Sequence, residues 1–201
     1  MAAVRCAGQR IVIVGGGAVA RRRAEMFALH GANVRVFDPH VSPEEQWPEG
    51  VKFIRRRVSQ RDLQNTWLVV VATNDAEVND RVGRWAAELG LEVNRADEVD
   101  AGTFAVPAVI ENPDGWQLAI LGGEAGPLFS TWLKSVIKMS LGLPKVDQMY
   151  RALADTRLAL KGRDDLSAQQ RSEVMRKVMG EALESAEPVN IEKFLEKILP
   201  P

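Results

Sequence analysis

Cysteine is nearly absent from this sequence of 201 residues, because Cys6 is the only one. A single cysteine cannot form a disulfide within the chain and cannot build a cysteine-rich metal site. Histidine is also rare, and His30 and His40 belong to no cluster with the spacing of metal ligands. We therefore expect a protein of a reducing compartment that holds no metal ion.

The sequence also lacks a strong charge of either sign. Its 26 lysines and arginines balance 27 aspartates and glutamates, and the formal net charge is -1. Bulk electrostatics therefore favours neither a nucleic acid nor a membrane surface as a partner. No apolar run approaches the roughly 20 residues of a membrane-spanning helix, and residues 1–9 lack the apolar core of a secretory signal. These absences predict a cytoplasmic protein.

What the sequence does contain is a glycine-rich turn between a strand pattern and a helix pattern. Residues 11–14 form a β-branched run, and residues 15–20 have the Gly-x-Gly-x-x-Ala form of the dinucleotide-binding fingerprint. Gly15 allows the tight turn, and Gly17 lets the backbone come close to a pyrophosphate. Ala20 lets the helix pack closely on the strand. The turn therefore predicts a dinucleotide site.

The residues around this turn extend the predicted cofactor site. At the helix start, Ala18 and Val19 offer free N–H groups and a partial positive charge to the phosphates. Asp38 and Pro39 end the next predicted strand, and Asp38 follows Gly15 at close to the roughly 20-residue spacing of the acid that binds the adenosine ribose. Because a carboxylate there repels a 2′-phosphate, the sequence favours NAD over NADP.

Two alternatives remain open on the fingerprint alone. A glycine turn can occur in an α/β protein that binds no dinucleotide. A methyltransferase also carries a glycine-rich loop after its first strand and an acidic residue at its second. The flanking strand, the helix and the acidic residue support the dinucleotide site but do not exclude the methyltransferase.

The pattern of apolar residues in the first half of the chain predicts an α/β fold, a Rossmann-type doubly wound parallel sheet. Short apolar runs indicate buried strands, and 3.6-residue periodicity indicates helices. Right-handed crossovers then bring the strands into one parallel sheet. The predicted strands are residues 11–14, 34–37, 51–54, 67–72 and 91–94, and the predicted helices between them are residues 21–30 and 76–89.

The pattern changes in the second half of the chain. Residues 103–110 and 117–121 predict two strands joined by a turn, and Pro127 begins a predicted helix with a broad apolar face. From Pro144 onward the periodicity is helical, with a capping box at Ser167. The expected divisions are a Rossmann domain at residues 1–102, a segment of two strands and a helix at 103–143, and a helical C-terminal domain at 144–201.

Four motifs, in order, resemble those of the precorrin-2 dehydrogenase family, which includes the N-terminal part of siroheme synthases. Residues 14–24 resemble the opening V-G-G-G-x-V-A-x-R-K-A, and residues 72–79 resemble A-T-(D/N)-(D/N)-x-x-(V/L)-N. Residues 94–108 are similar to N-x-x-D followed by F-x-x-P-(A/S), and residues 122–128 are similar to the turn G-G-x-S-P-x-L. The resemblance covers about residues 8–145 in register.

The resemblance implies NAD-dependent oxidation of precorrin-2 to sirohydrochlorin in siroheme and tetrapyrrole biosynthesis. It also implies a homodimer interleaved through residues 103–143. Some relatives insert iron into the product, so a bifunctional dehydrogenase and ferrochelatase is one alternative, and a non-enzymatic NAD-sensing module is another. Gly126, a substrate-binding candidate by its position in the last motif, stands where the family often has serine.

Asp97 is the candidate catalytic acid or base. It follows the last predicted strand of the sheet, at the carboxyl edge where the nicotinamide is expected. A carboxylate there can take the proton that the substrate loses along with a hydride. The alternatives are that Asp97 caps a turn and that the neighbouring Asp100 is the acid.

Four other polar residues are candidate contacts to the cofactor or the substrate. Thr73 and Asn74 follow a predicted strand and can hydrogen-bond the nicotinamide ribose or amide, although helix capping explains them equally. Arg22 and Arg95 can bind the carboxylates of a tetrapyrrole. The alternative for Arg22 is a solvated helix face.

Overall fold

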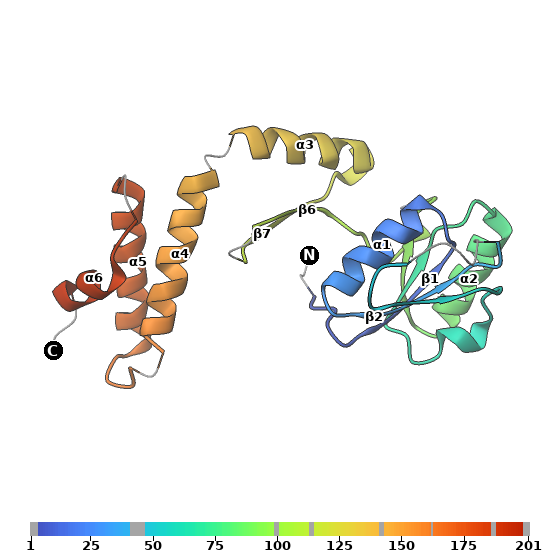
Figure 1. The fold of residues 1–201 in the computed structure, drawn as a ribbon, viewed down its shortest axis with the longest axis horizontal. Coiled ribbons are helices and arrows are strands. Elements are labelled where there is room, and N and C mark those ends of the chain that lie inside the picture. The colour runs from blue at the N-terminus through green and yellow to red at the C-terminus, as the bar shows by residue number, and fades with distance from the viewer. Residues whose placement is uncertain are drawn as a thin grey trace. The chain divides into compact units, whose positions relative to one another are not determined.

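The computed structural model describes residues 4–40, 47–98, 101–112, 115–140, 143–161, 163–185 and 188–198. The chain divides into two compact units, residues 1–106 and residues 107–201 (Figure 1). Among the described residues, no helix is long and apolar enough to cross a membrane.

The first unit contains one parallel sheet with the strand order β3-β2-β1-β4-β5. The chain runs outward from the centre to β3 and then returns to the other side of β1. The gap between β1 and β4 is therefore the point where the winding reverses, and ligands bind at the carboxyl edge of such a sheet. The strands are β1 (Arg10–Val14), β2 (Asn33–Phe37), β3 (Val51–Ile54), β4 (Leu68–Val71) and β5 (Glu92–Arg95).

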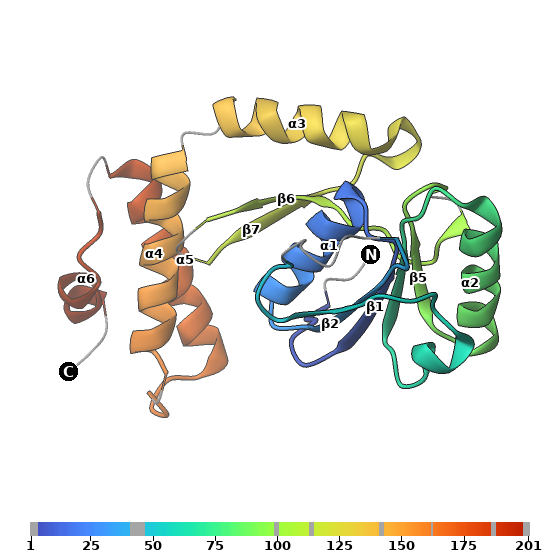
Figure 2. The ribbon, with the colours of Figure 1, turned by 45° about the vertical axis from the view of Figure 1, so that its right-hand side comes forward.

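Two helices cover opposite faces of this sheet (Figure 2). Successive side chains of a strand point to opposite faces, so Ile11 and Ile13 of β1 pack toward α1 (Ala18–Leu29) while Val12 and Val14 pack toward α2 (Ala76–Glu88). The short helix η1 (Gln60–Leu63) adds Leu63 to the α2 side. The predicted doubly wound α/β fold is confirmed.

The complete burial of β4 explains why the strands of the sheet could be predicted from the sequence. All four of its residues are fully buried, because the sheet is covered on both faces. Burying an aliphatic side chain of this size contributes roughly 1.5–3 kcal/mol, so a continuous apolar run is stable only in such a doubly covered strand.

One predicted strand was wrong in its first half. Residues 103–110 were expected to be extended in one strand, but β6 begins at Ala108 and ends at Glu111. The preceding residues pack along β5 instead: Val93 N donates to Thr103 Oγ1 at 2.9 Å, and Phe104 N donates to Val93 O at 2.9 Å. Pro107 then has no N–H group for a strand ladder.

The second unit begins with a hairpin and one helix. β6 pairs antiparallel with β7 (Gln117–Ile120), and the short helix η3 (Gly123–Ala125) leads into α3 (Gly126–Ser140). On α4 (Leu143–Ala159), Asp147 Oδ1 accepts hydrogen bonds from Asn112 Nδ2 at 2.6 Å and from Trp116 Nε1 at 2.8 Å. These two bonds fasten the hairpin to the helices that follow.

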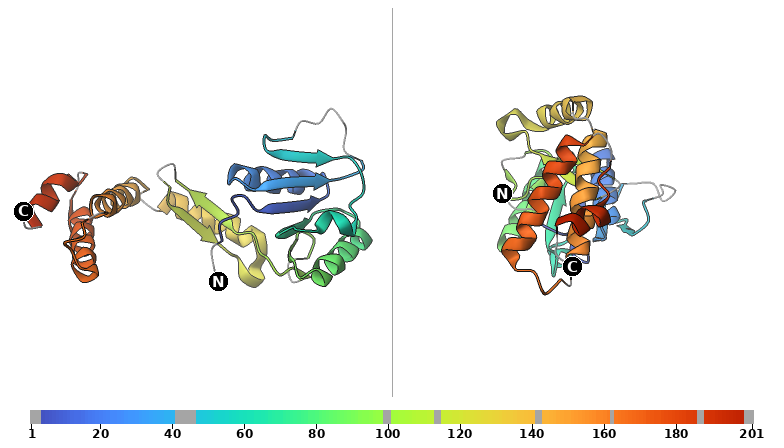
Figure 3. Two further views of the ribbon diagram at one scale, coloured as in Figure 1. Left: turned by 90° about the horizontal axis from the view of Figure 1, so that it is seen from below. Right: turned by 90° about the vertical axis from the view of Figure 1, so that its left-hand side faces the viewer.

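The rest of the second unit is helical, as predicted. α4 and α5 (Ala168–Glu184) lie side by side, and α6 (Ile191–Ile198) crosses them (Figure 3). Ser167 forms the expected capping box with Gln170 at the start of α5. The interior between these helices is apolar, and it includes Ala152, Val178 and Ala182.

Candidate functional site at the carboxyl edge of the sheet

The glycine turn follows β1 and lies between the ends of its two neighbouring strands. Gly15 N donates to Phe37 O at 2.9 Å, and Gly15 has φ +113°. A Cβ atom at this position would lie 2.3 Å from Ala72 O. Only glycine fits here, because any larger residue would combine backbone strain with a clash against Ala72, the residue after β4.

The start of α1 can accept an anion. Gly17 is its N-cap residue, and a Cβ built on Gly17 meets no atom within 4 Å. The N–H groups of Ala18 and Val19 precede the first helical hydrogen bond, which runs from Arg21 N to Gly17 O. The open space at Gly17 and the positive helix end fit a pyrophosphate.

Asp38 and Pro39 follow β2 directly, beside this turn. Asp38 N donates to Ile54 O at 3.3 Å, and Asp38 Oδ1 accepts a hydrogen bond from His40 N at 2.7 Å. The half-buried carboxylate is therefore held in a local turn next to Phe37, the residue whose carbonyl binds Gly15. This is the position at which a ribose diol is recognised in dinucleotide-binding folds.

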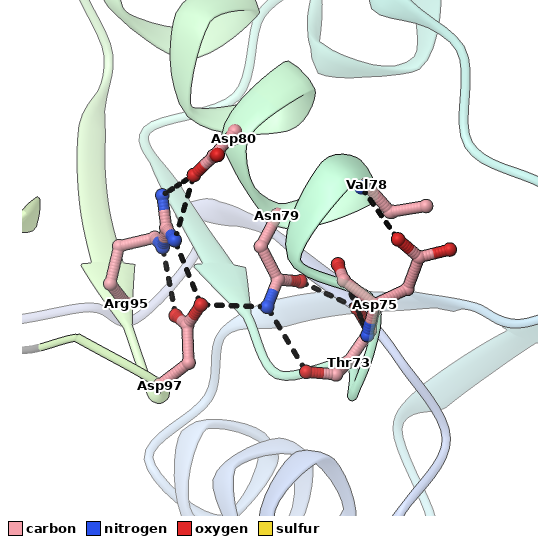
Figure 4. A network of polar contacts seen from close by, with 7 residues as sticks. All are labelled: Thr73, Asp75, Val78, Asn79, Asp80, Arg95 and Asp97. Carbon is pink, nitrogen blue, oxygen red and sulfur yellow. Dashed lines mark hydrogen bonds and ion pairs between the residues drawn. The ribbon is translucent and has the colours of Figure 1, made fainter.

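A second polar group lies on the same edge of the sheet, past the ends of β4 and β5 (Figure 4). Its centre is Asn79 of α2, which is only 1% exposed. Asn79 Nδ2 donates to Thr73 O at 3.0 Å and to Asp97 Oδ2 at 2.8 Å. Thr73 Oγ1 donates to Asn79 Oδ1 at 2.5 Å. Asn79 therefore ties the segment after β4 to the segment after β5.

Arg95, the last residue of β5, completes this group. Its Nε and Nη2 donate to the two oxygens of Asp97, each at 2.8 Å, and its Nη1 and Nη2 donate to Asp80 Oδ1 at 3.1 Å. Charge-assisted bidentate pairs of this kind are among the stronger hydrogen bonds in proteins. Arg95 is 7% exposed, so both of its ion pairs are shielded from water on one side.

These contacts decide the protonation state of Asp97. The hydrogen bonds from Arg95 hold the pKa of the Asp97 carboxyl well below its usual range, with a smaller contribution from Asn79. The same pairing raises the pKa of Arg95. The Asp97 side chain remains 30% exposed. The site therefore presents a stable carboxylate at the edge of the sheet.

The structure gathers most of the predicted site residues along this edge. Thr73 contributes its hydroxyl to the network, whereas Asn74 is exposed beside it. The residue that caps α2 is Asp75, whose carboxylate accepts from Val78 N at 3.1 Å, and not Thr73 or Asn74. Arg22 lies exposed on α1. Asp100 lies outside the described residues.

Gly126 lies in the second unit, at the first residue of α3. It has φ +73°, and its carbonyl accepts a hydrogen bond from Ser130 Oγ at 3.3 Å. A Cβ atom on Gly122 would lie 2.0 Å from Gly126 O. Glycine at position 122 therefore lets the backbone of this turn pass close to the carbonyl of Gly126.

Sequence analysis assigned no role to Asn79 and Asp80. A usable signal existed for Asn79, because it shares the apolar stripe of α2 with Val82 and Ala86. A buried asparagine on such a stripe needs hydrogen-bond partners. For Asp80 there was no signal, because an exposed acid on a helix is ordinary. Among the described side chains, no group of three or more His, Cys, Asp or Glu residues could hold a metal ion.

Comparisons with known proteins find a family of dinucleotide-binding domains. The family model described as "Putative NAD(P)-binding" matches residues 2–108. The siroheme synthase of Azotobacter vinelandii is 31% identical over 162 residues, which cover 75% of this chain and 35% of that protein. The precorrin-2 dehydrogenase of Priestia megaterium is 35% identical over 130 residues, which cover 63% of each chain.

A solved structure extends the similarity over the whole chain. The structure titled "SirC, precorrin-2 dehydrogenase" matches with a TM-score of 0.76 and 26% sequence identity. The match covers 98% of this chain and 97% of that one. This chain nevertheless spans less than two thirds of the length of the curated relatives named above.

Proposed function

The chain belongs to the NAD(P)-binding family whose model covers residues 2–108, and on that premise we propose that it is an NAD-dependent precorrin-2 dehydrogenase. It oxidises precorrin-2 to sirohydrochlorin, a step of siroheme and tetrapyrrole biosynthesis. The observation that carries the proposal is the Asp97 carboxylate, held at the same sheet edge as the dinucleotide turn. The similarity to a solved precorrin-2 dehydrogenase along nearly the whole chain supports the choice of substrate.

The cofactor half of the site suits NAD rather than NADP. Gly15 and Gly17 leave room for the pyrophosphate, and the N–H groups of Ala18 and Val19 face it. Asp38, followed by Pro39, binds the adenosine ribose hydroxyls and repels a 2′-phosphate. The bound cofactor supplies the hydride acceptor.

The protein itself supplies orientation and charge. The substrate loses a hydride from carbon and a proton, and Asp97 is the carboxylate that contacts it during that loss. Asn74, exposed beside Thr73, hydrogen-bonds the nicotinamide ribose or amide. Arg22 binds a carboxylate of the tetrapyrrole. Gly126, in the second unit, stays a predicted substrate contact. Arg95 directs its donors at two carboxylates of the chain, so we propose that it acts on the substrate through Asp97.

The decisive experiment mixes the purified protein with NAD⁺ and precorrin-2 without oxygen. We expect the absorbance of sirohydrochlorin and of NADH to rise together, in equal amounts. A parallel reaction with NADP⁺ should be much slower, because of Asp38. The proposal fails if neither cofactor supports oxidation while the protein binds NAD⁺.

We also propose a homodimer formed through α3 and the hairpin. α3 leaves several large apolar side chains exposed, among them Leu128 at 86%, Trp132 at 59% and Met139 at 79%. A contiguous apolar surface of this kind generally binds a partner. A Trp132→Glu variant should sediment as a monomer where the unchanged protein sediments as a dimer, and a monomeric unchanged protein would contradict the proposal.

We further propose that the protein works in the cytoplasm. Its single cysteine, Cys6, is half-buried, and burial raises the pKa of its thiol. Because one cysteine cannot form a disulfide within the chain, the sequence fits a reducing compartment. Fractionation of the source cells tests this directly.

A further inference from the structure

We propose that Arg95 is a positioning residue: anchored by Asp80, it fixes the Asp97 carboxylate in one orientation and in its ionised form at the carboxyl edge of the sheet. The proposal rests on the proposed function, because it assigns the work of the same site. It departs from both roles expected from the sequence, in which Arg95 binds substrate and Asp97 takes a proton.

The orientation of Asp97 follows from three donors on two oxygens. Arg95 Nε and Nη2 bind Oδ1 and Oδ2, each at 2.8 Å, and Asn79 Nδ2 binds Oδ2 at 2.8 Å. A guanidinium fork matches the carboxylate plane, so rotation of the carboxylate would break both parallel bonds at once. The remaining acceptor capacity is available toward solvent, through the exposed 30% of the side chain.

Arg95 needs an anchor of its own, because a long side chain loses much conformational freedom when it is fixed. Asp80 supplies it by accepting from Nη1 and Nη2 at 3.1 Å. Gly83 of the same helix lies beside the guanidinium, and a Cβ there would make an ordinary van der Waals contact with Nη1 at 3.5 Å. Asn79 and Asp80 are neighbours on α2, so one helix turn holds both Asp97 and the residue that clamps it.

The charges of this group suit the departure of a hydride. One guanidinium faces two carboxylates, so the group carries a net charge of -1. When a substrate carbon transfers a hydride to NAD⁺, giving NADH, the macrocycle is left with a positive charge. A preorganised carboxylate stabilises that charge as it forms. The oxidised macrocycle then releases one proton to water, which completes sirohydrochlorin.

The same geometry makes Asp97 a poor proton acceptor. Its pKa is held well below the usual range by Arg95, whereas an efficient general base has a pKa near the working pH. The fixed-charge role needs only that Asp97 stay ionised. The clamp, which is Arg95 bound to Asp97 and anchored by Asp80, keeps it so.

Four variants test the clamp with purified full-length protein. Arg95→Gln removes the charge, Arg95→Lys keeps the charge but loses the fork, and Asp80→Asn weakens the anchor without touching Asp97. Arg84→Gln is the matched control, because Arg84 is an exposed arginine on the same helix. Each variant is assayed for kcat and KM with precorrin-2 and NAD⁺ between about pH 4.5 and 8.5. The titration of the Asp97 carboxyl is followed by ¹³C NMR into acid, well below the ordinary aspartate pKa of about 3.9.

We expect Arg95→Gln to lower kcat by about 10–100-fold, because Asp97 loses its fixed orientation, with KM for NAD⁺ unchanged. Its Asp97 carboxyl should titrate about 1–3 pH units higher, because an adjacent arginine lowers the pKa of an aspartate by that amount. In Arg95→Lys the pKa of the Asp97 carboxyl should stay nearly as low as in the unchanged protein, and kcat should still fall. Asp80→Asn should show a smaller loss, and Arg84→Gln none.

Failure of this inference is distinguishable from failure of the proposed function. If the unchanged protein oxidises precorrin-2 but Asp97 titrates alike with and without the Arg95 charge, the clamp is overturned. An Arg95→Gln variant as active as Arg84→Gln overturns it as well. If no protein oxidises precorrin-2, the proposed function fails, and the NMR titration still decides whether Arg95 fixes Asp97. Should Arg95→Gln fail to fold, Arg95→Lys and Asp80→Asn still test the orientation of Asp97, and a kcat equal to that of Arg84→Gln in both variants overturns the proposal.

Discussion

At the β1–β2 half of the sheet edge the backbone forms the site, whereas at the β4–β5 half side chains form it. The first half consists mainly of glycine positions and free N–H groups, with Asp38 as its one side-chain candidate, so most of its geometry comes with the strand-turn-helix connection. The second half consists of Thr73, Asn79, Arg95 and Asp97, which reach one another across three elements. Because the two halves are built differently, a substitution in one half should impair cofactor binding and a substitution in the other should impair substrate oxidation. The predictions below test this separation.

The largest effect is expected for Asp97→Asn. The variant keeps the size of the side chain but removes the negative charge that stabilises the cationic macrocycle, and kcat for precorrin-2 oxidation should fall by about 10²–10³-fold. NAD⁺ affinity, measured by calorimetry, should not change, because the charge lies in the other half of the edge. Glu98→Gln, which neutralises an exposed neighbouring carboxylate, is the matched control and should remain active. If Asp97→Asn lost both NAD⁺ affinity and turnover, the two halves of the edge would not act separately.

A pair of glycine variants tests the backbone half. Gly15→Ala should destabilise the fold by more than about 1 kcal/mol, because its φ is positive and its Cβ would clash with Ala72 O. Gly17→Ala should leave the urea midpoint nearly unchanged, because the added methyl meets no protein atom, and should weaken NAD⁺ binding. Equal stability of the two variants would mean that the turn is not confined by β4.

Cofactor choice is expected to shift by a smaller amount. Asp38→Ala removes the carboxylate that repels a 2′-phosphate, so the ratio of kcat/KM for NADP⁺ to that for NAD⁺ should rise about tenfold, or roughly 1.4 kcal/mol. Asn74→Ala is a useful companion, since it lies on the other half of the edge and should not alter the ratio. An unchanged ratio after Asp38→Ala would remove the electrostatic basis for preferring NAD.

The smallest effect concerns stability against pH. Asp97 has a folded-state pKa below its unfolded value of about 3.9, so its pairing stabilises the fold above that unfolded value and the contribution is lost as pH falls through the folded pKa. Urea unfolding of the unchanged protein and of Asp97→Asn should therefore differ more at neutral pH than in acid. A constant difference would mean that the Arg95 pair adds no net stability.

The backbone half was also the more predictable one. Residues 11–14 and 67–72 were readable as strands because a doubly covered sheet requires continuous apolar runs. The tight turn at Gly15 was readable because it depends on position relative to a strand end, whereas the ribose-binding role of Asp38 stays a prediction. The strand from Thr103 was wrong, because the hydroxyl of that residue and the backbone of Phe104 bind β5 before the hairpin begins.

The side-chain half was only partly predictable. Asp97 was found through a motif, but nothing in the sequence says that Arg95 points at it rather than at the substrate. The register that sets Val71 opposite Arg95 turns Arg95 toward α2, on the same face as Val93. That register is known only once the strand order is known, and the contacts of Asn79 and Asp80 follow from it.

The first turns of α2 have a consequence for the dynamics of the site. Asp75 caps the helix, Asn79 binds Asp97, and Asp80 anchors Arg95, all within residues 75–80. Fraying of this helix end would release the cap, the amide and the anchor together, so these bonds open as one cooperative unit. Amide hydrogen exchange in residues 76–80 should therefore be slower while Arg95 is paired with Asp80 and Asp97 than in a variant that breaks these ion pairs. The exchange rate at this helix end then measures how well the side chains at the carboxyl edge are ordered.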